Sequence, residues 1–113
     1  MKFLIVDDED LVRRSLRRAA ESRGHEVIEA EDGEKGLNIW KKNKPDVVFL
    51  DVLMPGLTGP QVLEEMDDRK GARVILMSAY TGEEKSRAWP AYDLFIPKPF
   101  ANIFEVIERA EKL

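Results

Sequence analysis

The chain has 113 residues, 43% of them hydrophobic. This is long enough to bury one hydrophobic core without disulfides or a structural metal, so we expect a single domain spanning residues 1–113. It contains no cysteine, which excludes disulfides and thiolate metal sites. A net charge of -4 argues against direct binding of nucleic acid. The first apolar run starts too close to Met1 and is too short for a signal peptide, and no stretch is long enough to cross a bilayer. We therefore expect a cytoplasmic protein without a membrane partner.

The first predicted unit is a strand, a helix and a second strand. The apolar run FLIV at 3–6 predicts the first strand, and EVIEA at 26–30 predicts the second. Gly24 marks the end of the helix between them. The residues that recur at helical spacing in this helix are Leu11, Val12, Leu16, Ala19 and Ala20.

The same alternation continues to the end of the chain. Strands are predicted at 47–50 (VVFL), 74–77 (VILM) and 94–96 (LFI). Helices are predicted at 36–42, 60–67 and 102–112, with a short one at 82–89 that Pro90 cuts off. Five such repeats predict an α/β fold, a doubly wound parallel sheet with helices on both faces.

Strand composition predicts the order of the sheet. The first, third and fourth strands are continuously apolar, which is typical of central strands covered on both faces. EVIEA alternates and LFI is short and runs into Pro97, so these two belong at the edges. The order 2-1-3-4-5 satisfies both conditions, and ligands in such sheets bind beyond the carboxyl ends of the strands.

Acidic residues gather at those carboxyl ends. Asp7 and Asp8 follow the first strand in the sequence DDED, which alone is also compatible with a helix start, and Asp51 follows the third. Asp51 precedes the loop VLMPGLTG and not a helix, so capping does not account for it. Three carboxylates close together without a neutralising cation would raise the pKa of at least one of them. A bound Mg²⁺ ion would supply the missing positive charge.

A magnesium ion, a hydroxyl and an ammonium around one aspartate indicate phosphoryl transfer onto that carboxylate. The hydroxyl and the ammonium come from residues at the ends of the fourth and fifth strands. We expect Mg²⁺ to be held by Asp8, Asp51 and the backbone carbonyl of Leu53, with Asp7 acting through water, and the phosphoryl group to be bound by Lys98 and Ser78.

Four motifs, IVDDED, DVLMPGLTG, LMSAY and IPKPF, together resemble the CheY-like receiver domain of bacterial two-component response regulators, over essentially the whole chain. The resemblance implies a flavodoxin-like (βα)5 fold, Asp51 as phosphoacceptor, a cis Lys98-Pro99 bond, and a switch through Ser78 and Phe95. It implies as partners a histidine kinase or histidine phosphotransfer protein, and a downstream protein target or output domain. Such a domain catalyses its own phosphorylation and dephosphorylation but is not a turnover enzyme.

The sequence also departs from the family. The segment 78–98 is shorter than usual and contains Pro90, so the fourth helix is expected to be shortened or irregular, and the usual signalling surface is not carried over. Phe95 lacks the hydroxyl of the tyrosine often found at its position. The side chains of Leu53 and Tyr80, which flank the site, are expected to shield the phosphoryl group from water and prolong its lifetime.

Other functions are weaker alternatives. One alternative is a phosphate-independent interaction module with the same fold. Such a module would not need the acids, the Ser78 hydroxyl and Lys98; the acids are Asp7, Asp8 and Asp51. A flavin carrier needs a phosphate-binding loop where DDED stands. A phosphohydrolase with an aspartyl-phosphate intermediate would usually need an acid at position 53, which is leucine.

The remaining residues are expected to be structural. His25 is predicted to be a surface turn residue without a role in phosphotransfer, and Trp40 to cover the sheet. Gly56 and Gly59 are predicted turn formers. A basic cluster is predicted to be a solvated helix face. It comprises Arg13, Arg14, Arg17, Arg18 and Arg23.

Overall fold

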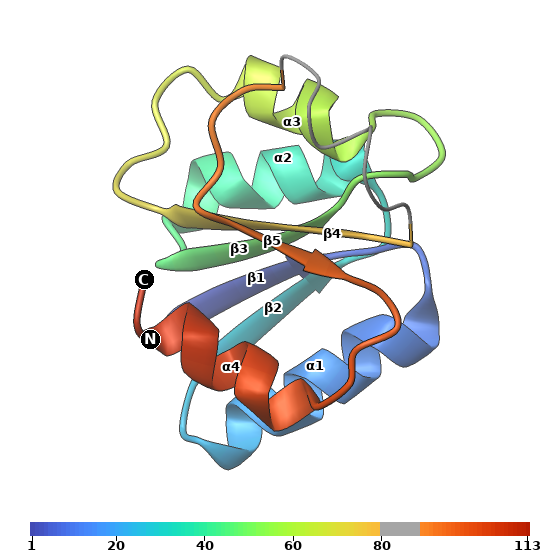
Figure 1. Ribbon diagram of the computed structural model, residues 1–113. Helices are drawn as coiled ribbons and strands as arrows, with labels where there is room; N and C mark the ends of the chain where they lie inside the picture. Colours follow the sequence, from blue (N-terminus) through green and yellow to red (C-terminus); the bar gives the residue numbers. More distant parts are fainter. Residues whose placement is uncertain (80–88) are drawn as a thin grey trace.

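A computed structural model describes residues 1–79 and 89–113 and contains a five-stranded parallel sheet between two layers of helices (Figure 1). The strand order β2-β1-β3-β4-β5 confirms the predicted topology, with the continuously apolar strands in the centre. The strands are β1 (Lys2–Val6), β2 (Glu26–Ala30), β3 (Val47–Asp51), β4 (Arg73–Ser78) and β5 (Leu94–Pro97).

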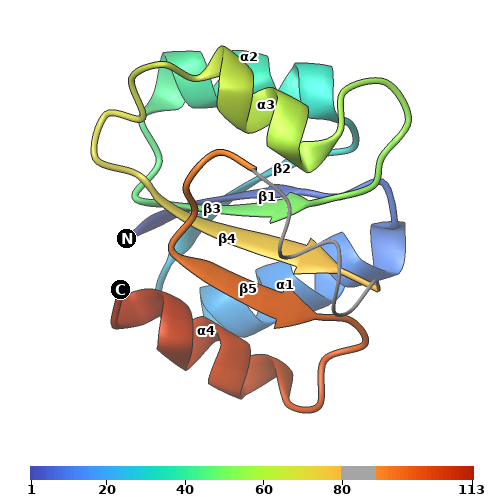
Figure 2. The ribbon, with the colours of Figure 1, turned by 45° about the horizontal axis from the view of Figure 1, so that its top comes forward.

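Each central strand divides its side chains between two cores, because successive residues of a strand point to opposite faces. Phe3 and Ile5 of β1 face the core under α1 (Asp10–Ser22) and α4 (Ile103–Glu111). Leu4 and Val6 face the core under α2 (Gly33–Asn43) and α3 (Gly59–Glu65) (Figure 2). Trp40 is fully buried in this second core, as predicted. Both faces of the sheet are thus covered, which leaves the carboxyl ends of the strands as the place for a site.

Local capping sets the helix starts. Helix α2 begins three residues earlier than predicted, because the Asp32 side chain accepts a hydrogen bond from the backbone N–H of Lys35. Thr58 and Gln61 form a reciprocal capping box at the start of α3. Asn102 caps α4.

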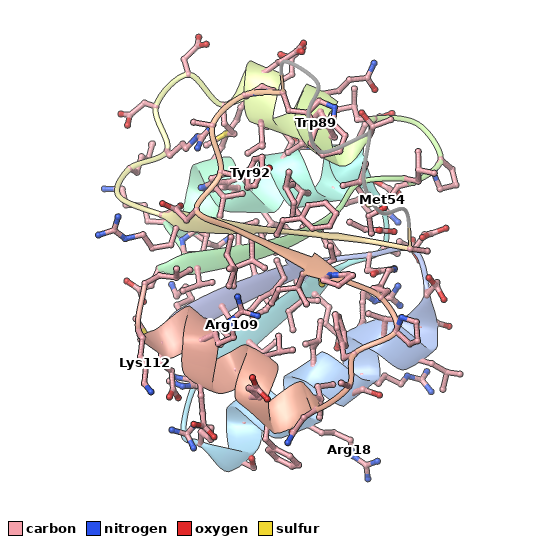
Figure 3. The ribbon with its side chains drawn as sticks, in the orientation of Figure 1. Arg18, Met54, Trp89, Tyr92, Arg109 and Lys112 are labelled. Atoms are coloured by element: carbon pink, nitrogen blue, oxygen red, sulfur yellow. The ribbon has the colours of Figure 1, made fainter. Side chains whose placement is uncertain are left out.

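The segment before β5 packs on the second core. Trp89 and Tyr92 lie on the side of the sheet that carries α2 and α3 (Figure 3). Their ring centroids are 6.5 and 6.4 Å from that of Phe95. The predicted helix 82–89 lies outside the described residues except for Trp89, which has no regular secondary structure, and Tyr80 lies outside them as well.

Among the helices that the structure describes, none has the length and hydropathy needed to span a membrane.

His25 corrects one expectation. Its side chain is only 10% exposed, it stacks on Phe3 with centroids 4.5 Å apart, and its Nε2 lies 2.5 Å from Oε2 of Glu111. The prediction of a surface turn residue was therefore wrong, because the ring is largely covered and lies against Phe3 of β1 and Glu111 of α4. His25 is not among the residues that line the candidate site described below.

The basic cluster is only partly a solvated face. Arg14 and Arg18 are exposed on α1, as expected. Arg13 and Arg17 both pair with Glu29 of β2. These pairs place charged side chains along the outer edge of the sheet, a common way to discourage pairing with another strand.

Candidate functional site

The carboxyl ends of the parallel strands all lie at one end of the sheet, on the side away from the two chain termini (Figure 2). Here the structure brings together the residues predicted from the sequence. Asp7 follows β1, Asp51 and Ser78 are the last residues of β3 and β4, and Lys98 follows β5. A cavity of about 260 Å³ lies among them and is lined by Asp8, Glu9, Asp51, Leu53, Ser78, Ala79 and Lys98.

Three carboxylate side chains at these strand ends form an acidic cluster. Carboxylate oxygens of Asp7, Asp8 and Asp51 lie within 4.8 Å of one another, with Asp7 and Asp51 buried and Asp8 exposed. Oxygen donors of this kind suit Mg²⁺, which binds to one or two carboxylates and keeps several waters. The donor set therefore fits the expected ion, and the exposed Asp8 leaves one side open to solvent and phosphate.

Lys98 contacts this cluster directly. Its Nζ lies 2.9 Å from Oδ2 of Asp7 and 3.4 Å from Oδ1 of Asp51. The backbone N–H of Lys98 donates a 2.8 Å hydrogen bond to the carbonyl of Ser78, which fixes the segment after β5 against the end of β4. The Lys98-Pro99 peptide bond is cis, which confirms the expectation.

Burial and charge shift the ionisation of the site. Desolvation of the Asp51 carboxyl, reinforced by the negative charge of Asp7, raises its pKa to about 7. Desolvation also raises the pKa of Asp7, although its hydrogen bonds from Glu9 and Lys98 oppose the effect. Burial disfavours the charged form of Lys98, but its hydrogen bonds to Asp7 and Glu9 outweigh this and raise the pKa of the ammonium. The site is thus short of positive charge, with Lys98 fully protonated.

The loop after Asp51 depends on two glycines. Gly56 adopts φ +77°, a left-handed conformation that favours glycine. A Cβ atom on Gly59 would lie 2.5 Å from the carbonyl oxygen of Asp51, and the Gly59 N–H donates to the carbonyl of Val52. The predicted turn formers therefore let the loop fold back against the end of β3. Leu53 lies on this loop with 48% of its surface exposed.

Sequence reasoning missed the part played by Glu9. It is the N-cap residue of α1, yet its side chain makes no capping hydrogen bond; Oε1 instead accepts a 3.0 Å hydrogen bond from Lys98 Nζ. The helix does start at DDED, but the Glu9 side chain pairs with Lys98 and does not cap the helix. Asp7 Oδ1 accepts from the Glu9 N–H, and Arg13 donates to the carbonyl of Asp7, so the acidic turn is held from both sides. DDED indicated an acidic turn, but nothing in it identified a partner 89 residues away.

Comparison with known proteins agrees with this geometry. The model of the response regulator receiver domain matches residues 3–110. Over 99% of its length the chain is 37% identical to a probable transcriptional regulator, ycf27, of Porphyra purpurea, and over 100% it is 34% identical to the response regulator MprA of Mycobacterium sp. (strain KMS). It covers 49% and 50% of these two proteins, so the chain spans about half the length of the curated relatives it matches.

Among solved structures, the response regulator TrrA of Thermotoga maritima, in complex with Mg(2+)-BeF, superposes with a TM-score of 0.86 at 34% identity. The match covers 98% of this chain and 96% of TrrA. The strand order, the acidic cluster facing a lysine and the matched family model agree: the chain belongs to the family of response regulator receiver domains.

Proposed function

We propose that the chain is a signalling switch that accepts a phosphoryl group on Asp51 with the help of Mg²⁺. As a receiver domain it is phosphorylated by a kinase and is not a turnover enzyme. The observation that carries the assignment of Asp51 is its position: a nearly buried carboxylate at the end of a central strand, 3.4 Å from the Lys98 ammonium and within the acidic cluster. A carboxylate held in this way can act as a nucleophile.

The proposed step is a simple displacement at phosphorus. One Asp51 carboxylate oxygen forms a new P–O bond, while the P–N bond to the histidine of the donor protein breaks. The electron pair of the broken bond stays on the imidazole nitrogen, which then takes a proton. Mg²⁺, when bound, neutralises charge on the phosphoryl oxygens and helps to align the group.

The chain's own residues supply the rest of the charge balance. Asp8 and Asp51 are the proposed metal ligands together with the backbone carbonyl of Leu53, and Asp7 acts through water. The Lys98 ammonium then binds one phosphoryl oxygen, and the Ser78 hydroxyl donates to another. Support comes from the cavity of about 260 Å³, which Asp8, Ser78 and Lys98 all line.

The proposed partners follow from the family. The phosphodonor is a histidine kinase or a histidine phosphotransfer protein, and the proposed setting is the cytoplasm, in line with a chain that lacks cysteine. Relatives about twice as long include proteins described as transcriptional regulators. We propose that residues 1–113 form one receiver domain whose output is either an attached domain or a separate protein, with no direct contact to nucleic acid.

The competing function is an interaction module with the same fold that ignores phosphate. Titration with beryllofluoride in the presence and absence of Mg²⁺, followed by amide NMR spectra, distinguishes the two. A switch that accepts a phosphoryl group on Asp51 is expected to bind beryllofluoride only when Mg²⁺ is present, with the largest shifts around Asp51, and Asp51→Ala is expected to abolish the response. A matched control, Asp67→Asn, changes an exposed acid after α3 and retains it. A parent chain that shows no coupled response is the result expected of the interaction module.

A further inference from the structure

Three carboxylates compete for the ammonium of Lys98. Its Nζ lies 2.9 Å from Asp7 Oδ2, 3.0 Å from Glu9 Oε1 and 3.4 Å from Asp51 Oδ1. An ammonium has three N–H donors, so these three acceptors match its full donor capacity. To bind a phosphoryl oxygen, Lys98 must give up one of its present partners.

The exposure of the three carboxylates decides which partner is given up. The Asp7 side chain has 0% of its surface exposed, and a buried carboxylate that loses its counter-ion is strongly destabilised. Asp51 is the group that becomes modified. The Glu9 side chain is 61% exposed, so water can replace the ammonium there at little cost. Glu9 is therefore the partner that Lys98 leaves.

We propose that Glu9 is a positioning residue that holds Lys98 in the unphosphorylated chain and competes with the incoming phosphoryl group for it. This inference rests on the proposed function of Asp51. Binding of the phosphoryl group transfers Lys98 to a phosphoryl oxygen and releases the Glu9 carboxylate to solvent. The strength of the Glu9–Lys98 pair therefore sets how readily the site accepts a phosphoryl group.

Release of the Glu9 side chain also affects a neighbouring cavity. A larger cavity of about 630 Å³ lies beside the site, between the first turns of α1 and the segment that follows β5. Glu9, Ala79 and Lys98 line both cavities. The Glu9–Lys98 pair is thus part of their shared wall, and opening the pair changes both cavities at once.

The first test compares Glu9→Gln with Asp10→Asn. Both substitutions remove one negative charge at the start of α1, but Asp10 pairs with Arg13 and not with Lys98. With beryllofluoride as the probe and Mg²⁺ at saturation, we expect Glu9→Gln to bind about three- to tenfold more tightly than the parent, and Asp10→Asn to differ by less than about twofold. Equal effects of the two variants would show that only the overall charge matters and would overturn the proposal.

The second test follows the Glu9 side chain directly. In the parent, we expect the side-chain carboxyl ¹³C resonance of Glu9 to move, on addition of beryllofluoride and Mg²⁺, to the position that it has in Lys98→Met, where the pair cannot form. A Glu9 resonance that stays in place while the amides around Asp51 shift would refute the release of Glu9 and leave the proposed function standing. A parent that binds no beryllofluoride would refute the proposed function itself, and with it the role of Glu9.

Discussion

Replacing Asp51 with asparagine should stabilise the metal-free chain. The substitution keeps the shape of the side chain and removes one charge from a cluster in which Asp7 is fully buried. The pKa of Asp51 is raised from 3.8 to about 7, and at about 1.4 kcal/mol per tenfold change this difference sets an upper bound of about 4 kcal/mol on the cost of ionising Asp51 at neutral pH. Because Lys98 also loses an ion-pair partner, we expect an increase of about 1 to 3 kcal/mol in the free energy of unfolding.

The increase in the free energy of unfolding caused by Asp51→Asn should grow as the pH rises. Between the unfolded value of 3.8 and the folded value of about 7, the folded parent keeps a proton that the unfolded chain has lost. The free energy of unfolding of the parent therefore falls as the pH rises through this range and remains low above it. Asp51→Asn lacks this titration, so its advantage should be fully present at about pH 8 and mostly gone at about pH 4.

Urea unfolding of the parent, Asp51→Asn and the surface control Asp67→Asn at several pH values measures the effect. Saturating Mg²⁺ should stabilise the parent and reduce the advantage of Asp51→Asn, because the ion binds the folded parent through Asp51. If Asp51→Asn is no more stable than the parent at about pH 8 without Mg²⁺, then Asp51 is not a crowded carboxylate and the electrostatic account of the site is wrong.

Three further predictions concern the surroundings of the site. Gly59→Ala should lower the free energy of unfolding by about 2 kcal/mol or more, because its Cβ would lie 2.5 Å from the Asp51 carbonyl oxygen; urea unfolding checks this, and a neutral effect would show that the loop shifts freely. Leu53→Asn should shorten the lifetime of the acyl phosphate several-fold by giving water a polar partner, so unchanged or slower decay contradicts a shielding role. Amide spectra around Ser78 and Phe95 should shift together on addition of beryllofluoride with Mg²⁺, and unchanged spectra there would rule out the switch.

The sheet and the convergence of the site could be predicted because they follow from local patterns and a general rule of topology. The continuously apolar strands identified the centre of the sheet, and EVIEA gave the bounds of β2 as observed. Parallel strands place their carboxyl ends at one edge, so Asp51 and Lys98 had to approach each other. The start of α2 was placed at Gly36, whereas Asp32 caps the helix and lets it begin at Gly33.

Contacts between distant segments could not be predicted. His25 follows a glycine in a polar turn, so the sequence indicates exposure, whereas in the fold its ring stacks on Phe3 and its Nε2 contacts Glu111. In the same way, DDED indicates an acidic turn but not which acid meets Lys98. That choice depends on how α1 starts relative to the segment after β5, a tertiary arrangement that no local pattern contains.

The central claim is that Asp51 is the phosphoacceptor. It is tested most directly by incubating the chain with acetyl phosphate and Mg²⁺, reducing the product with borohydride, and locating the modified residue by peptide mass spectrometry. The account predicts a single modification, at Asp51, that disappears when Mg²⁺ is chelated. Modification at another residue, or labelling of Asp51→Ala to the same extent as the parent, would contradict it.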